Sequence, residues 1–230
     1  MLECDSNIFS LEPFLEGIRA FKSAHPEALP QRSNFDIVDA LRPSRDLNRT
    51  SYQRLKKGFL EEQIFSGKSN KPGIYFFFEL KMEKPDFYYI GISGTKQNQT
   101  QALKDRIGKH LLTKDFIFYA LAFSQNEDDY YKETTHFYAE GGYPSHEDEY
   151  RRQFDGLKKV RPTYLAWISC ENYSLVERDG IETHFIAEFS PPANKQKKKA
   201  VPNVRYREQY ELIKEYLFKR ITEYGTGEKC

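Results

Sequence analysis

The sequence predicts an α+β fold in which a small, mainly antiparallel central sheet is flanked by helices. Two aromatic and β-branched runs, residues 73–78 and 87–92, are separated by a polar segment containing Pro85, a pattern typical of an antiparallel hairpin. Two more apolar runs have the length of strands, 116–123 (FIFYALAF) and 163–170 (TYLAWISC). Helices are predicted in the segments 11–21, 51–65, 175–189 and 205–224.

The N-terminal part is expected to be helical. Ser10 is placed to cap a helix whose apolar residues recur at helical spacing: Leu11, Phe14, Leu15, Ile18 and Phe21. This helix ends before Pro26, because proline disfavours a helical conformation in the residue before it. The segment 31–71 is mixed and rather basic, and its clearest helix spans 51–65. A nucleic-acid-binding arm and an ordinary amphipathic surface both fit this segment.

The chain after the hairpin is expected to begin with a short helix. This helix carries Arg106 and His110, four residues apart on one face. Beyond the strand 116–123 comes an acidic, tyrosine-rich and turn-prone segment, 124–145, which has the character of an inserted loop. The next predicted helix has acids in its first turn and lysines near residue 159, as the helix dipole favours.

Two helices are predicted in the C-terminal part. The helix 175–189 carries Glu182 and ends before Pro191 and Pro192. The last helix has an apolar stripe, which we interpret as core packing: Tyr206, Tyr210, Ile213, Leu217 and Ile221.

The charge distribution excludes a uniformly basic nucleic-acid binder. The 230 residues contain 35 Lys and Arg against 34 Asp and Glu, a net charge of +1. Cations are nevertheless concentrated between residues 195 and 207, where no acid occurs, and acids between 125 and 150. We expect a solvated acidic surface and a basic segment that contacts DNA phosphates through Lys195, Lys197, Lys198 and Lys199.

Composition limits the cellular setting. Hydrophobic residues make up 39% and charged residues 30%, which is ordinary for a globular protein. No apolar run approaches the ~18 residues that a membrane span needs, and the first residues lack a signal-peptide pattern. The cysteines, Cys4, Cys170 and Cys230, are few and far apart, which supports neither a disulfide framework nor a zinc cluster. We therefore expect a cytoplasmic protein without a membrane partner.

Two triplets in the hairpin carry a specific resemblance. Gly73-Ile74-Tyr75 and Tyr89-Ile90-Gly91 are identical to the two signature triplets of the GIY-YIG nuclease family. Arg106 and His110 are similar to the arginine and the histidine or tyrosine that follow in that family. A single tyrosine of this set would be better explained as a core residue. The ordered combination favours the family.

The closing motif of the family is also matched. The segment from Glu182 to Asn194 resembles the family pattern of a metal-binding glutamate on a helix followed, past a proline, by an asparagine. The resemblance covers about residues 72–194 and implies the GIY-YIG nuclease fold. It explains neither terminal region, and we expect both to be helical elaborations of that fold. It implies a catalytic set of six residues: Tyr75, Tyr89, Arg106, His110, Glu182 and Asn194.

The resemblance implies a role for each charged group in phosphodiester hydrolysis. Glu182 would bind Mg²⁺, with Mn²⁺ as a substitute, because a hard cation needs few carboxylates when phosphate and water complete its shell. Arg106 would hold the phosphate as negative charge develops in the transition state. His110 would relay protons or orient a tyrosine.

The two tyrosines and the asparagine complete the implied set. Tyr75 would be the general base, which requires a pKa lowered by the metal or by Arg106. Tyr89 would bind the phosphate or position water, and Asn194 would brace the site. One departure concerns Ile92, since many family members have lysine directly after the second triplet. A lysine-assisted base is therefore not expected here.

We expect three parts in the chain. Residues 1–70 form an N-terminal helical extension, 71–194 a nuclease core with an insertion at about 124–160, and 195–230 a basic segment with a C-terminal helix. The leading hypothesis is a Mg²⁺-dependent DNA endonuclease of restriction type that cleaves double-stranded DNA. A homodimer would suit a palindromic site. The alternatives are a repair, structure-specific or mobile-element nuclease, and a protein that binds nucleic acid without cleaving it.

Overall fold

The computed structural model describes residues 6–24, 71–82, 84–94, 102–109, 155–194 and 200–226. Several predicted features lie outside these residues: the helix 51–65, the strand 116–123, the acidic insertion, His110, and the lysines Lys195, Lys197, Lys198 and Lys199. The chain divides into two compact units, and each is treated by itself. Among the described helices, none is long and apolar enough to span a membrane.

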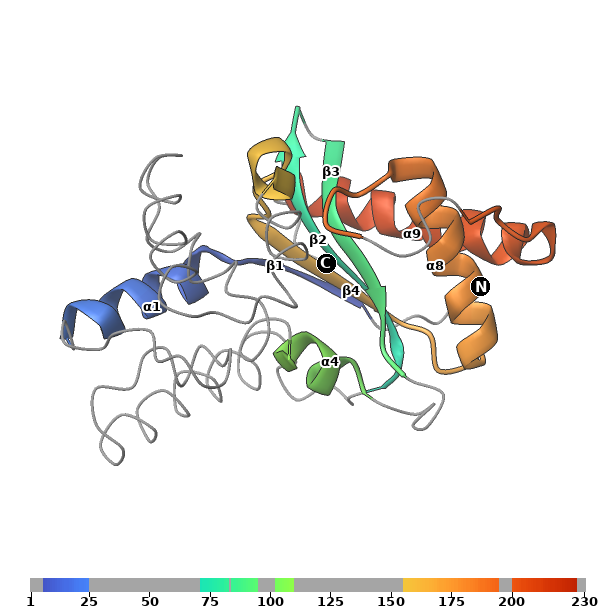
Figure 1. Cartoon of the computed structure of the whole chain (residues 1–230), viewed down its shortest axis with the longest axis horizontal. Helices are drawn as coiled ribbons and strands as arrows, with labels where there is room; N and C mark the ends of the chain where they lie inside the picture. Colours follow the sequence, from blue (N-terminus) through green and yellow to red (C-terminus); the bar gives the residue numbers. More distant parts are fainter. Residues whose placement is uncertain are drawn as a thin grey trace. The chain divides into compact units, whose positions relative to one another are not determined.

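A four-stranded sheet forms the centre of the first unit (Figure 1). Its order is β1-β4-β2-β3, and every neighbouring pair is antiparallel. The strands are β1 (Ser6–Ser10), β2 (Gly73–Lys81), β3 (Lys84–Ile92) and β4 (Tyr164–Ser169). With helices on the sheet, the predicted α+β class and its small antiparallel sheet are confirmed. β1 was not predicted, because its five residues carry no clear alternation and pair with a strand far along the chain, Ile8 opposite Ala166.

The hairpin strands are longer than predicted. The polar segment 79–86, predicted as the turn, belongs mostly to β2 and β3. Pro85 is tolerated because β3 is an edge strand, so its missing N–H leaves no inner neighbour unpaired. Lys81 bridges the strands here, with Nζ 3.3 Å from the Glu79 carboxylate and 2.8 Å from that of Asp86.

A β-bulge sets the orientation of the second triplet. The pairing shifts between Phe77, which lies opposite Tyr89, and Phe78, which lies opposite Phe87, so that Tyr88 is the extra residue. Without the bulge, residues three apart would point to opposite faces, but here Phe87 and Ile90 both enter one core. Tyr89 is consequently turned to the other face, which it shares with Tyr75.

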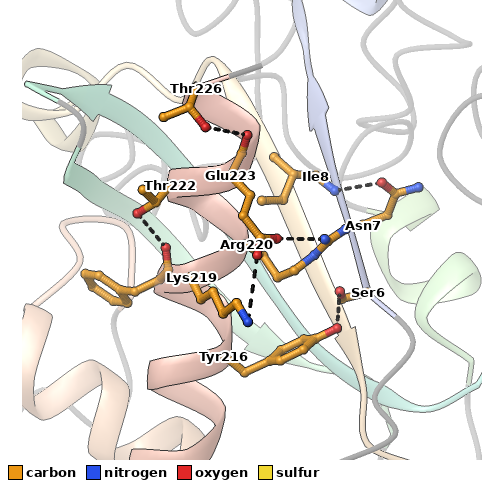
Figure 2. A network of polar contacts seen from close by, with 10 residues as sticks. Ser6, Asn7, Ile8, Tyr216, Lys219, Arg220, Thr222, Glu223 and Thr226 are labelled. Atoms are coloured by element: carbon orange, nitrogen blue, oxygen red, sulfur yellow. Dashed lines mark hydrogen bonds and ion pairs between the residues drawn. The ribbon is translucent and has the colours of Figure 1, made fainter. Parts of the chain in front are cut away.

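The helices α8 (Leu175–Phe189) and α9 (Arg207–Gly225) cover one face of the sheet, with a short 3₁₀ helix, η4 (Val204–Tyr206), between them in the chain (Figure 1). The bounds of α8 agree with the prediction. The predicted stripe of the last helix is buried throughout, which confirms core packing: Tyr206, Tyr210, Ile213, Leu217 and Ile221. Figure 2 shows α9 beside β1, where the hydroxyls of Tyr216 and Ser6 are 2.8 Å apart.

The second unit contains α1 (Glu12–Ala24). Leu11, Phe14 and Leu15 are buried, in agreement with the predicted apolar stripe. The predicted cap at Ser10 is wrong. The Leu11 carbonyl accepts from the amides of Phe14 and Leu15 at 3.0 Å, so Leu11 precedes the helix and Ser10 ends β1.

Candidate active site

Tyr75 and Tyr89 lie side by side on the sheet face opposite the helical core. Their ring centroids are 6.0 Å apart and their planes are inclined by 32°. Tyr75 lies opposite Gly91 in the β2–β3 pairing and Tyr89 lies opposite Phe77. Tyr75 has no exposed surface, whereas Tyr89 is half-buried. The two triplets therefore place both hydroxyls in one cluster.

Gly91 makes this arrangement possible. A Cβ atom on Gly91 would lie 2.4 Å from the Tyr75 hydroxyl oxygen and 2.8 Å from the Tyr89 ring. Real Cβ atoms do not approach other heavy atoms this closely, so any larger residue would displace the Tyr75 ring. The glycine of the second triplet thus serves the tyrosine of the first, which explains why the two triplets occur together.

Arg106 joins the tyrosine pair from α4 (Leu103–Lys109). Its side chain is half-buried and lies close enough to Tyr75 and Tyr89 for both tyrosines to raise its pKa. Burial lowers the pKa of Arg106, but the two tyrosines outweigh burial and leave that pKa raised. Its buried Nε finds no hydrogen-bond acceptor among the described residues. Arg106 is therefore a half-buried cation whose Nε–H group is unsatisfied among the described residues.

Glu182 brings a carboxylate to the same cluster. It lies on the buried side of α8 and is 7% exposed, which is unusual for an acid. Its charge is close enough to Tyr75 to raise the pKa of that tyrosine. The described chain thus brings Tyr75, Tyr89 and Arg106 together, with the Glu182 carboxylate within electrostatic reach of Tyr75, and the four residues come from four different elements.

The pKa of Tyr75 is raised well above its ordinary value. Burial is the largest cause, Tyr89 and Glu182 add to it, and the charge of Arg106 lowers the pKa by less. Arg106 lowers the pKa of Tyr75, as expected, but does not by itself offset burial, so the lowered pKa that a general base needs stays a prediction that involves the metal. The physical reason is that burial disfavours the Tyr75 phenolate more than the positive charge of Arg106 favours it.

Asn194 lies at the outer edge of β3. Its side-chain Oδ1 accepts from the Ile90 amide at 2.9 Å, and its Nδ2 donates to the Ile90 carbonyl at 2.7 Å. The Ala193 amide donates to the Tyr88 carbonyl at 3.1 Å. The segment after α8 therefore pairs with the open edge of the strand that carries Tyr89. Asn194 is a buried brace that contacts backbone groups.

Three consecutive carbonyls at the start of β2 hold the elements of the site together. The Lys71 carbonyl accepts from the Leu103 amide, which begins α4, at 3.1 Å. The Pro72 carbonyl accepts from Cys170, in the turn that leads to α8, at 2.8 Å. The Gly73 carbonyl accepts from Ser93, at the end of β3, at 2.9 Å. The elements bearing Arg106, Glu182 and Tyr89 thus share one anchor.

Gly73 is required at this anchor. A Cβ atom there would lie 2.0 Å from the Ile168 carbonyl oxygen and 2.9 Å from the Leu103 side chain. Ser93, which no motif singled out, is fully buried, and its hydroxyl accepts from the Gly73 amide at 2.8 Å. In the sequence, the only sign of a role for Ser93 is its place directly after Ile92. The contact between Ser93 and Gly73 cannot be read from the sequence.

The structure does not describe two of the sequence-predicted groups. His110 lies outside the described residues, as do Lys195, Lys197, Lys198 and Lys199. Ile92 pairs with Ile74 and packs against the helical core. A side chain at position 92 therefore points away from the tyrosines in this fold.

The donor set fits a hard cation that shares its ligands with a substrate. No group of three or more His, Cys, Asp and Glu side chains that could hold a metal ion occurs within the described ranges. Mg²⁺ commonly binds one or two carboxylates and takes its other ligands from phosphate and water. One buried carboxylate, Glu182, in a site that also holds the half-buried cation Arg106, is compatible with this kind of Mg²⁺ site.

The chain was compared with known proteins. No protein-family model, curated protein or solved structure matches it.

Proposed function

We propose that this chain is a Mg²⁺-dependent DNA endonuclease of the GIY-YIG type, which hydrolyses phosphodiester bonds of double-stranded DNA in a restriction-type reaction. The observation that supports this most is the cluster of Arg106 with Tyr75 and Tyr89 beside the buried carboxylate of Glu182. A permanent cation, hydroxyl groups and one carboxylate are what a charged phosphodiester requires. The signature triplets support the family assignment.

Arg106 is proposed to bind the scissile phosphate. Its guanidinium is half-buried beside two tyrosines, so little reorganisation is needed when charge develops on the phosphate. The buried Nε without an acceptor supports this role, because a buried unsatisfied donor costs about 1–3 kcal/mol and is commonly found where a ligand binds.

The tyrosine pair is proposed to orient the attacking water. Tyr89 is half-buried and is the more accessible of the two, and Tyr75 is fully buried in the space that Gly91 leaves. The proton of the water would pass to the Tyr75 phenolate, which becomes a phenol; forming that phenolate requires the charge of a bound cation, because burial raises the pKa of Tyr75. Glu182 would hold Mg²⁺, which when bound supplies charge stabilisation at the phosphate.

The test is cleavage of plasmid and phage DNA with and without Mg²⁺. We expect discrete fragments from the wild type, no cleavage in EDTA, and a loss of about 10³-fold or more in Glu182→Gln. Glu215→Ala, at an exposed acid of α9, is the control and should cut normally. Nicks or cuts at branched DNA would favour a repair or structure-specific enzyme. Tight DNA binding without any cleavage would overturn the proposal.

A further inference from the structure

Arg178 is a buried cation of α8 that the family motif does not use. Its side chain is 2% exposed. Nη1 donates to the carbonyl oxygens of Tyr173 at 2.5 Å and of Cys170 at 3.5 Å. Burial lowers its pKa, which Cys170 and Glu177 offset only in part. Because a buried ionic group is often replaceable by an apolar one without loss of stability, packing alone does not account for an arginine here.

The carbonyls that Arg178 binds belong to the turn between β4 and α8. The Tyr173 amide donates to the Cys170 carbonyl at 3.1 Å, and the Cys170 amide donates to the Pro72 carbonyl at 2.8 Å. Pro72 directly precedes the first triplet. A chain of hydrogen bonds thus runs from the start of the Tyr75 strand, through this turn, to α8.

Glu182 lies one helical turn beyond Arg178 on the same buried side of α8. The start of α8 is already stabilised by a capping box, in which Ser174 Oγ accepts from the Glu177 amide and Glu177 accepts from the Ser174 amide. Helix formation therefore does not need Arg178. What Arg178 adds is a tie between the helix and the sheet.

We propose that Arg178 is a positioning residue for Glu182. Its guanidinium clamps the 170–173 turn against α8 and thereby sets where the Glu182 carboxylate stands relative to Tyr75 and Arg106. This inference rests on the proposed function, because it takes Glu182 as the ligand of the cation.

The test compares Arg178→Met and Arg178→Lys with Glu177→Ala. The control removes the carboxylate of the capping box from the same helical turn but leaves the clamp intact. Mn²⁺ affinity is measured by calorimetry, the Mg²⁺ concentration for half-maximal cleavage by DNA digestion, and exchange of the Cys170 amide by hydrogen–deuterium exchange. These readouts separate positioning from a general loss of stability.

We expect Arg178→Met to bind Mn²⁺ about 10–100-fold more weakly, as for other groups that support a metal ligand, and to need correspondingly more Mg²⁺. Its Cys170 amide should exchange at least about 10-fold faster, since the 170–173 turn that carries this amide is no longer clamped. Arg178→Lys keeps the charge but not the planar guanidinium, so its Mn²⁺ affinity should lie between those of the wild type and Arg178→Met. Glu177→Ala should lower the Tm and leave Mn²⁺ affinity unchanged.

Wild-type Mn²⁺ affinity in Arg178→Met would overturn the proposal, as would an equal loss of affinity in Glu177→Ala. If Arg178→Met does not fold, the comparison rests on Arg178→Lys. If the wild type binds Mn²⁺ through Glu182 but cuts no DNA, the proposed nuclease function is refuted. The role of Arg178 is then decided by the Mn²⁺ affinities of its variants alone. Mn²⁺ binding that does not depend on Glu182, or no binding, would refute the role of Arg178.

Discussion

The side-chain amide of Asn194 satisfies both backbone groups of Ile90, accepting from the N–H at 2.9 Å and donating to the carbonyl at 2.7 Å. Ile90 is the middle residue of the second triplet, and all of these atoms are buried. An edge strand normally exposes such groups to solvent or to another chain. Here a single asparagine closes the edge at the residue next to Tyr89.

Asn194→Ala should destabilise the protein. Two buried hydrogen bonds are lost and two backbone groups are left unsatisfied, so we expect a cost of about 2–4 kcal/mol. The measurement is urea unfolding followed by fluorescence of Trp167, the only tryptophan. Asn203→Ala is the matched control: Asn203 is exposed and its side chain caps η4 by accepting from the Arg205 amide, so its loss should cost less than about 1 kcal/mol. Equal effects would contradict the bracing role.

Gly91→Ala should displace Tyr75. The added Cβ would lie 2.4 Å from the Tyr75 hydroxyl oxygen, so we expect a loss of about 1–3 kcal/mol and of cleavage activity. Gly225→Ala is the control, because nothing lies within 4 Å of a Cβ at the end of α9. Combining Gly91→Ala with Tyr75→Leu should cost less than the sum of the single variants, because both the hydroxyl oxygen and the ring carbon 2.6 Å from the added Cβ are gone. Strict additivity would argue against this contact.

Arg106→Ala should abolish cleavage while the fold persists. Loss of a preorganised cation at the phosphate typically costs about 10²–10³ in rate, and Arg106→Lys should recover little of it because lysine lacks the planar fork. Single-turnover cleavage at saturating DNA is the measurement, with circular dichroism as a check on folding. Lys104→Ala on the same helix should cleave at the wild-type rate. An active Arg106→Ala would exclude the proposed phosphate contact.

Stability should fall at alkaline pH because of Tyr210. Burial raises the pKa of Tyr210, and its hydrogen bond to the Glu188 carboxylate raises it further. An unfolded tyrosine loses its proton near pH ~10, so above that pH the unfolded state binds fewer protons than the folded state and stability declines. Each such tyrosine contributes up to about 1.4 kcal/mol per pH unit in this window.

Tyr210→Phe should therefore be less stable than the wild type at pH 7, where it lacks the hydrogen bond, but should lose less stability above pH ~10. Urea unfolding at pH values of ~9, ~10 and ~11 measures the two slopes. Tyr75→Phe should flatten the slope in the same direction, since the pKa of Tyr75 is also raised. Parallel pH profiles for the wild type and Tyr210→Phe would contradict the assigned cause.

Local features of the chain were predictable where the residues that determine them lie within one short segment. The aromatic runs of β2 and β3 have the pattern of strands, and α8 is bounded by Ser174 with Glu177 at its start and by two prolines after its end. The turn at 79–86 was predicted too long, because polar residues on an edge strand resemble loop residues. The β-bulge at Tyr88 has no sequence signature, since it depends on which residue of the partner strand lies opposite.

By itself, the sequence determines the residue types of the candidate site: two tyrosines beside glycines, an arginine, and a glutamate on a helix. Only the tertiary structure decides that Tyr75 is buried behind Tyr89, that β1 completes the sheet, and that Arg178 ties α8 to the strand of the first triplet. The physical reason is the range of the interactions. Helix caps and strand patterns act over a few residues, whereas burial and the hydrogen bonds of Asn194 and Ser93 arise only when distant segments pack together.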